Sequence, residues 1–318
     1  MTPVLALPVI ALPGIALWLV AAPAADELGL LPLASLHRPV PFEVEPGEEA
    51  PPLRGCPGPA LPALRERLPF GPGEQIAYDI TWLGVRTGRA HLRVGERIQM
   101  DGVATYPLQG QLKTDGFLSL LGDVDARMVS FFDPRELRPV RMVSRVEVRE
   151  PFASAPTVSI EDGAFSAAQL TPDGPRGGEV NARLRRSGGL GDFDKGGRFI
   201  SGADIVDLLS IIYYLRAHEL PAGAPFCFEL YHRRRLWRVT GAVKDVELVR
   251  APAGSRRARR LDAVLARVGR DAPPPRQVTA WISADADRVP WLVRTPEGMG
   301  SIEARLLSIA PGRRLVEK

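Results

Sequence analysis

The 318-residue sequence is poor in the residue types and motifs on which many enzymes depend. It has two cysteines and four histidines, and none of them shows metal-ligand or redox spacing. Four sequence patterns are also missing: Gly-x-Ser-x-Gly, His-Glu-x-x-His, the P-loop and Gly-x-Gly-x-x-Gly. These patterns are typical of hydrolases, metalloproteases and nucleotide-binding proteins. We therefore predict a non-enzymatic protein with no cofactor and no metal site.

The overall composition is that of a globular protein. Hydrophobic residues make up 45% of the chain and charged residues 25%, which excludes wholesale disorder and a polytopic membrane protein. Lysine is scarce, since only four of the 41 basic residues are Lys. The net charge of +4 is too small to indicate a partner by itself.

The N-terminus resembles an export signal. Residues 3–25 contain no charge, and the small residues Ala22 and Ala24 suit signal peptidase. We predict a signal peptide over residues 1–25 and a location in the periplasm or outer envelope. No Lys or Arg precedes the apolar run, so an uncleaved anchor stays the alternative.

Proline divides the remaining chain. Fifteen of the 31 prolines fall within the first 72 residues, and repeated Pro prevents helices and central strands. We expect an extended Pro-rich segment over residues 26–70 and a single folded domain over residues 71–312. In an oxidising compartment, Cys56 and Cys227 would join the two parts by a disulfide bond. The alternative is one buried and one exposed thiol.

Strict alternation of apolar and polar residues predicts a mainly β protein. Residues 76–82 and 90–94 alternate on either side of a Gly84–Gly88 turn, as in a hairpin. Asp133–Glu136 indicates a second turn, and Asp162-Gly163 suits a type I′ turn. Further strands are expected at 128–132, 140–148, 226–231, 236–249, 261–268, 278–283, 289–293 and 302–309. Many short strands with little helix indicate an antiparallel barrel-like or sandwich domain.

One amphipathic helix is expected over residues 202–218. Ser201 and Asp204 have capping-box spacing, and Ile205, Leu208, Leu209 and Ile212 follow the helical period. Pro221 ends the segment.

Arginine occurs in three runs, which could meet anionic lipid or lipopolysaccharide if the fold gathers them, although a solvated face is the ordinary role of such residues. Nucleic acid is not expected as a partner of an exported protein. The runs are Arg183/Arg185/Arg186, Arg233–Arg235 with Arg238, and Arg256/Arg257/Arg259/Arg260.

Three stretches together resemble a bacterial envelope family known as domain of unknown function 3108. They read PGEQIAYDITWLGVRTG at 72–88, DIVDLLSIIYYLR at 204–216 and WISADADRVP at 281–290. The resemblance spans about residues 70–310 and implies a signal-bearing, β-rich, barrel-like envelope domain. It supplies no catalytic residue. The long Pro-rich segment with Cys56 departs from the family pattern.

These observations favour an envelope protein that binds a lipid or another amphipathic component. Tyr213 and Tyr214 could place rings and hydroxyls at a wet pocket mouth, and Arg216 could meet a headgroup. A filled barrel that acts as a scaffold for envelope protein partners is the first alternative. A cell-envelope hydrolase is the second, with Asp204, Asp207, Arg216 and His218 as its candidate residues.

Overall fold

The computed structural model describes residues 61–64, 68–115, 122–151, 153, 155–169, 176–189, 191–269, 272–297 and 300–314. The predicted signal peptide (1–25), most of the predicted Pro-rich segment (26–70) and Cys56 lie outside these residues. Within the described ranges there are sixteen strands and one short helix, α1 (Ser210–Arg216). The strands are β1 (Gln75–Trp82), β2 (Val85–Val94), β3 (Ile98–Met100), β4 (Val103–Thr114), β5 (Asp123–Asp133), β6 (Arg138–Arg149), β7 (Thr157–Gln169), β8 (Arg176–Ser187), β9 (Phe193–Ser201), β10 (Ile205–Asp207), β11 (Pro225–Tyr231), β12 (Leu236–Ala251), β13 (Gly254–Arg267), β14 (Arg276–Ser283), β15 (Pro290–Glu297) and β16 (Gly300–Ala310).

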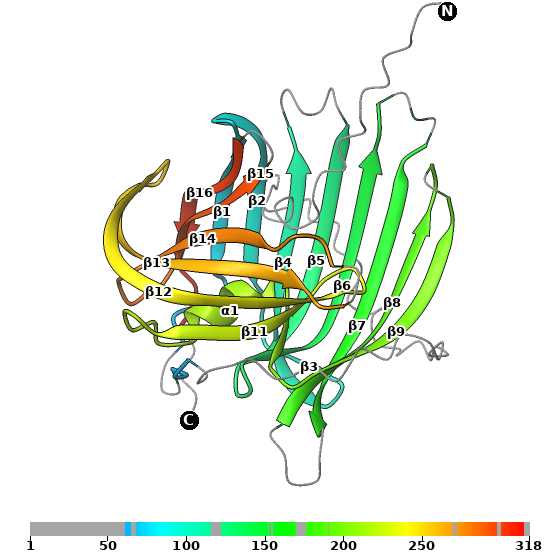
Figure 1. The fold of residues 1–318 in the computed structure, drawn as a ribbon, viewed down its shortest axis with the longest axis horizontal. Coiled ribbons are helices and arrows are strands. Elements are labelled where there is room, and N and C mark those ends of the chain that lie inside the picture. The colour runs from blue at the N-terminus through cyan, green and yellow to red at the C-terminus, as the bar shows by residue number, and fades with distance from the viewer. Residues whose placement is uncertain are drawn as a thin grey trace, which may run out of the picture.

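The strands form one continuous sheet in the order β10-β11-β12-β13-β14-β15-β16-β1-β2-β4-β5-β6-β7-β8-β9, with β3 paired to β4 beside this path. Neighbours are antiparallel except β10 and β11, which are parallel. The sheet curves around α1, as Figure 1 shows. The mainly β, barrel-like fold with one helix that the sequence predicts is therefore confirmed. No helix in the described part of the chain is long and apolar enough to cross a membrane.

Local sequence explains the strands well. In β2, Ala90, Leu92 and Val94 are buried, while Arg93 between them is exposed. The β1–β2 turn places Leu83 and Gly84 at positive φ (53° and 77°), as a two-residue hairpin with a type I′ turn requires. The turn predicted at Asp133–Glu136 lies between β5 and β6.

Buried side chains link opposite parts of the sheet across its interior. Its terminal strands β9 and β10 are not neighbours in the ladder. Instead, the Ser130 hydroxyl on β5 donates to Asp207 Oδ2 on β10 at 2.5 Å. The Tyr231 hydroxyl at the end of β11 donates to Glu161 Oε1 on β7 at 2.8 Å. All four side chains are buried, so these two bonds cross the interior.

The predicted helix is too long. Residues 205–207 form β10, because they pair with Glu229–Tyr231 of β11, and α1 begins only at Ser210. The Ser201 hydroxyl accepts from the Ala203 N–H, outside the helix. Asp207 Oδ1 instead accepts from the N–H groups of Leu209 and Ser210, where the helix starts.

The turn predicted at Asp162-Gly163 is also wrong. Both residues lie in the middle of β7, where Asp162 pairs with Val143 and Arg183. Long ladders on both sides of β7 outweigh the local turn preference. The end of the predicted Pro-rich segment packs on the domain: Ala63 bridges to His218, and the side chain of Phe70 is buried.

Candidate functional site

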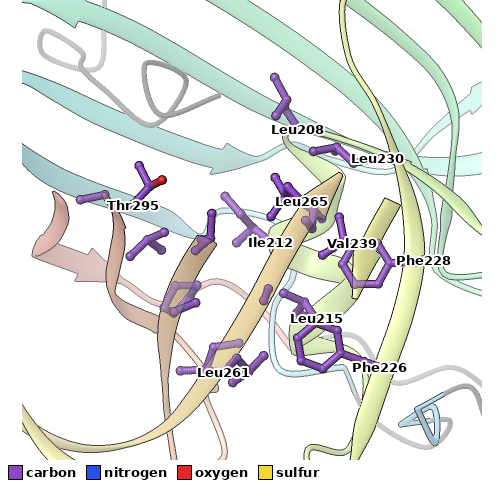
Figure 2. Close-up of a pocket in the computed structure, with 18 of the residues that line it drawn as sticks. Leu208, Ile212, Leu215, Phe226, Phe228, Leu230, Val239, Leu261, Leu265 and Thr295 are labelled. Carbon is purple, nitrogen blue, oxygen red and sulfur yellow. The ribbon is translucent and has the colours of Figure 1, made fainter. Parts of the chain in front are cut away.

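An apolar cavity of about 150 Å³ lies between α1 and the inner face of the sheet from β11 to β16 and β1. Twenty residues line it, and eighteen of them have purely hydrocarbon side chains. Figure 2 shows Phe226, Phe228 and Leu261 pointing toward the same space as Ile212 and Leu215 of the helix.

The register of the strands builds the sheet side of this cavity. Residues directly opposite each other in an antiparallel pair share one face of the sheet. One such row runs from Leu261 through Ala280 and Val293 to Ala304. Another row passes through Phe226, Gly241, Ala263 and Val278. Each row therefore includes two small residues: Ala280 and Ala304 in the first, Gly241 and Ala263 in the second. We call this part of the inner face the floor of the cavity.

These small residues leave the space empty. Ala263, Ala280 and Val293 lie in central strands, yet they are only half-buried, which is consistent with unfilled volume above them. At Gly241, by contrast, the Phe226 ring occupies the space that a side chain would take, since an added Cβ would collide with this ring. The floor is thus packed beside Phe226 and hollow beside the alanines.

The helical side of the cavity is formed by one stripe. Ile211, Ile212 and Leu215 of α1 line it, and so does Leu208, just before the helix, at the i, i+3, i+4 and i+7 spacing of a single helix face. The opposite side of α1 faces the main core. There, the rings of Tyr213 and Phe70 meet edge to face at 4.9 Å.

Only two lining residues carry polar groups, and both of these groups are satisfied. The Tyr78 hydroxyl donates to the Pro290 carbonyl at 3.0 Å, and Thr295 Oγ1 donates to the Gln277 carbonyl at 3.1 Å. Burial raises the pKa of Tyr78, so this phenol stays protonated. A ligand in the cavity would meet hydrocarbon and no competing polar group from its lining.

The predicted ligand-binding residues Tyr213, Tyr214 and Arg216 do not line this cavity. Tyr213 is fully buried, and Tyr214 packs on His218 with ring centroids 4.3 Å apart. The Tyr214 hydroxyl donates to Asp204 Oδ2 at 3.3 Å. Because both tyrosines are buried, neither hydroxyl lies at a solvent-exposed opening of the cavity. A role for these residues in ligand binding stays a prediction, and their visible role is packing.

Arg216 is the centre of a buried polar network. Its guanidinium donates to both carboxylate oxygens of Glu74, at 2.7 and 2.8 Å, and to the carbonyls of Pro69 and Asp287. It also lies 5.3 Å from the Phe70 ring centroid and 5.4 Å from that of Tyr213. These contacts tie α1 to the segment before β1 and to the β14–β15 connection.

Among the hydrolase candidates, Asp204 and His218 both contact Tyr214, whereas Asp207 and Arg216 belong to separate buried networks. Asp207 is fully buried among the donors of Ser130, Leu209 and Ser210, and burial raises its pKa. His218 follows the end of α1, and its Nδ1 lies 2.6 Å from the carbonyl oxygen of Tyr214. No group of three or more His, Cys, Asp or Glu side chains that could hold a metal ion occurs among the described residues.

Two of the three arginine runs meet in space. Arg186 of β8 and Arg234 of the β11–β12 turn lie over the same Phe193 ring, at 5.6 and 5.7 Å from its centroid. The third run lies near the start of β13, at the end of this strand that is farther from the β11–β12 turn. There, Arg256 pairs with Asp285 at 3.6 Å. The runs therefore do not form one patch.

The sequence did not reveal which side chains form the cavity. The alternation in β13 and β14 was visible, but alternation does not say which face is inward or which alanines stand opposite each other.

Cys227 lies on β11, half-buried and opposite Thr240. The described residues include no free cysteine. Since Cys56 is not described, the disulfide stays a prediction.

The fold and the cavity define a barrel-like antiparallel β protein with an internal apolar space beside one helix. Residues 176–307 match the family model described as Protein of unknown function (DUF3108), which confirms the family resemblance over these residues. No curated protein matches the chain.

Several solved structures match the chain at low sequence identity. A β-barrel-like protein of domain of unknown function DUF1849 from Brucella abortus has 11% identity and a TM-score of 0.45, with 80% of this chain and 100% of that chain covered. A protein from Parabacteroides distasonis, described provisionally as a lipoprotein, has 6% identity and a TM-score of 0.30 over 77% and 99% of the two chains. A protein from Bacteroides fragilis, described provisionally as exported and with a YmcC-like fold, has 9% identity and a TM-score of 0.29 over 77% and 99%.

Proposed function

We propose that this protein is an exported, non-enzymatic envelope protein whose cavity holds a hydrocarbon chain of a lipid or another amphipathic envelope component. The observation that carries the proposal is the cavity lining, in which eighteen of twenty side chains are hydrocarbon and both polar groups are satisfied. Small-molecule sites are typically concave and mostly apolar. Transfer of a hydrocarbon chain from water into such a site is favourable.

The dimensions suit one chain better than several. A dry cavity of about 150 Å³ in another protein accommodates benzene, which indicates room for only part of a chain. The inner face continues beyond the cavity along β13. The six-residue step from Leu261 to Arg267 spans about 20 Å at the usual rise per residue. One leaflet of a bilayer core is about 15 Å thick, so a single lipid chain fits this length.

Two alternatives are less well supported by the geometry. A filled barrel would leave no cavity under α1. A hydrolase would need reacting groups that share a cleft, whereas Asp207 and Arg216 are each fully buried in hydrogen bonds of their own. The apolar run and small residues of segment 1–25 support export, and lipopolysaccharide and other lipids are the candidate ligands in that compartment.

The test uses an uncharged apolar dye, phenylnaphthylamine, whose fluorescence rises in an apolar site. We expect saturable binding to the purified protein and displacement by a long-chain alcohol. Ala280→Leu fills the floor of the cavity and should weaken dye binding at least tenfold. Val264→Leu on the outer face of β13 is the matched control, because Val264 is 38% exposed and does not line the cavity.

Native mass spectrometry of protein purified without detergent supplies an independent readout. A bound lipid mass that disappears in Ala280→Leu but not in Val264→Leu supports the proposal. Ligand-free protein combined with dye binding that Ala280→Leu leaves unchanged would overturn it.

A further inference from the structure

The row of residues next to the cavity, toward the start of β12, is not purely apolar. Leu230 and Leu265 line the cavity. Trp237 stands opposite Leu230, Arg267 opposite Trp237, and Arg276 opposite Leu265. Since opposite residues share a face, all three side chains project from the cavity side of the sheet. We call Trp237, Arg267 and Arg276 the rim triad.

Trp237 provides a buried donor without an acceptor. Its indole Nε1 is buried and has no hydrogen-bond partner among the described residues. Leaving a buried donor unsatisfied is unfavourable, so such groups usually have a partner. A ligand oxygen at this position would accept that hydrogen bond.

The two arginines can reach the same point. Arg276 is a diagonal neighbour of Arg267 on adjacent strands, and diagonal neighbours lie about 7–8 Å apart, within reach of long side chains. Both are half-buried, and each already has an interaction in the structure. A guanidinium carries five N–H donors, so donors remain for an additional anion.

Further positive charge lies at the same end of the strands. The β11–β12 turn places Arg233 and Arg234 at positive φ, 46° and 57°, a conformation that non-glycine residues seldom adopt. The His232 and Arg235 backbones bond reciprocally across this turn. The turn directly precedes Trp237 in sequence, so it lies at the same end of β12 as the rim triad, although the Arg234 guanidinium itself donates to the Gly196 carbonyl of β9.

We infer that the rim triad binds an anionic oxygen headgroup, a carboxylate or a phosphate, of a single-chain amphiphile whose hydrocarbon tail follows the inner face of β13 and enters the cavity. This inference rests on the proposed function and names its ligand class. The tail lies between α1 and the small residues of β13–β16. The headgroup oxygens accept from Trp237 Nε1 and from the two guanidinium groups, which form short charge-assisted hydrogen bonds.

The experiment compares three ligands with the same sixteen-carbon chain: hexadecanol, palmitate and hexadecyl phosphate. Each displaces phenylnaphthylamine from the full chain. We expect both anions to bind at least tenfold more tightly than the alcohol, and the advantage to shrink as salt is added. The ratio of palmitate to hexadecyl phosphate identifies the preferred headgroup. Inorganic phosphate, which lacks a tail, should not displace the dye.

The decisive variant is Arg267→Gln with Arg276→Gln. It should reduce anion affinity to that of hexadecanol and leave hexadecanol unchanged. Trp237→Phe should weaken the anions about threefold to tenfold, since it removes one donor and keeps the ring. Arg260→Gln is the control, because Arg260 lies on the outer face of β13 and pairs with Asp262 at the surface.

The outcomes separate the two proposals. Equal binding of all three ligands, unaffected by the double variant, overturns the headgroup site but leaves the apolar site standing. A double variant that loses hexadecanol as well shows that the arginines shape the rim, which also overturns the inference. Failure of every ligand to bind overturns the proposed function itself.

Discussion

Arg216 and Glu74 form a bidentate ion pair in the interior, with side chains 0% and 3% exposed. The residues are 142 positions apart in sequence, so the pair fixes α1 against the entrance to β1. Breaking a buried pair on one side leaves an uncompensated charge, which typically costs about 3–5 kcal/mol. We expect Glu74→Gln to lower the free energy of unfolding by that amount in urea titrations.

Two further variants test this interpretation. Glu74→Leu combined with Arg216→Met removes both charges and should recover much of the loss, because apolar replacements of buried pairs are often tolerated. Glu96→Gln breaks the Arg313–Glu96 pair, whose side chains are 75% and 73% exposed, and should change stability by less than about 1 kcal/mol. Equal effects of Glu74→Gln and Glu96→Gln would contradict the assignment.

His218 should make stability depend on pH. Its Nδ1 lies 2.6 Å from the Tyr214 carbonyl, which can only accept, so Nδ1 carries the proton of the neutral ring. Burial lowers the pKa of His218 below its ordinary value of 6.5. The unfolded state therefore takes up a proton more readily, and stability falls as the pH drops below about 6.5.

Thermal unfolding between pH 7.5 and 5.5 measures this effect. His218→Asn keeps a donor for the Tyr214 carbonyl and should flatten the dependence. His91→Gln separates a second contribution, because burial and Arg89 lower the pKa of His91 in the same direction. A slope that both variants leave unchanged would assign the pH dependence to other groups.

Gly241 should tolerate no side chain. An added Cβ would collide with the Asp262 carbonyl oxygen and the Phe226 ring. We expect Gly241→Ala to cost at least about 1–3 kcal/mol, as overpacking of a close-packed interior does. Gly163→Ala is the control, since its nearest neighbour would be Met142 Cγ at an ordinary 3.4 Å. Urea midpoints of the two variants provide the comparison, and similar midpoints would refute it.

The Cys56–Cys227 bond remains a prediction with a direct test. Alkylation of protein from the envelope fraction without reductant, followed by mass spectrometry, should label neither cysteine. Closing so long a loop stabilises the folded state by roughly 4–5 kcal/mol in chain-entropy models, so Cys227→Ser should lower the unfolding midpoint. Two labelled thiols in this material would show that the bond is absent.

Local patterns predicted the parts of the fold that depend on neighbouring residues. The alternation in β2 identifies a strand because its buried positions are only two residues apart. The period of residues 205–212 suggested a longer helix, yet Ile205–Asp207 pair with β11, a contact that no local pattern contains. The sequence offered Arg216 as a candidate for meeting a headgroup, and its pairing with Glu74, 142 positions away, is likewise a contact that no local pattern contains.

The site was less predictable than the fold. The cavity depends on Leu261, Ala280, Val293 and Ala304 standing in one row, and this requires the register of three strand pairs. A buried donor without an acceptor, such as Trp237 Nε1, can be recognised only from the three-dimensional structure. Sequence alone could therefore suggest a ligand-binding barrel, but it could not name the residues that line the interior.

The position of β1 in the sheet has a consequence for folding kinetics. It lies between β2, its neighbour in sequence, and β16, with Gln75 paired to Ala310 across nearly the whole described chain. Contacts between such distant residues slow folding, because the loop entropy is lost before the contacts form. During synthesis β1 can pair with β2 but must wait for β16. Until then, one edge of the β1–β2 hairpin stays open to pairing with other chains, and a binding chaperone would be most useful in that interval.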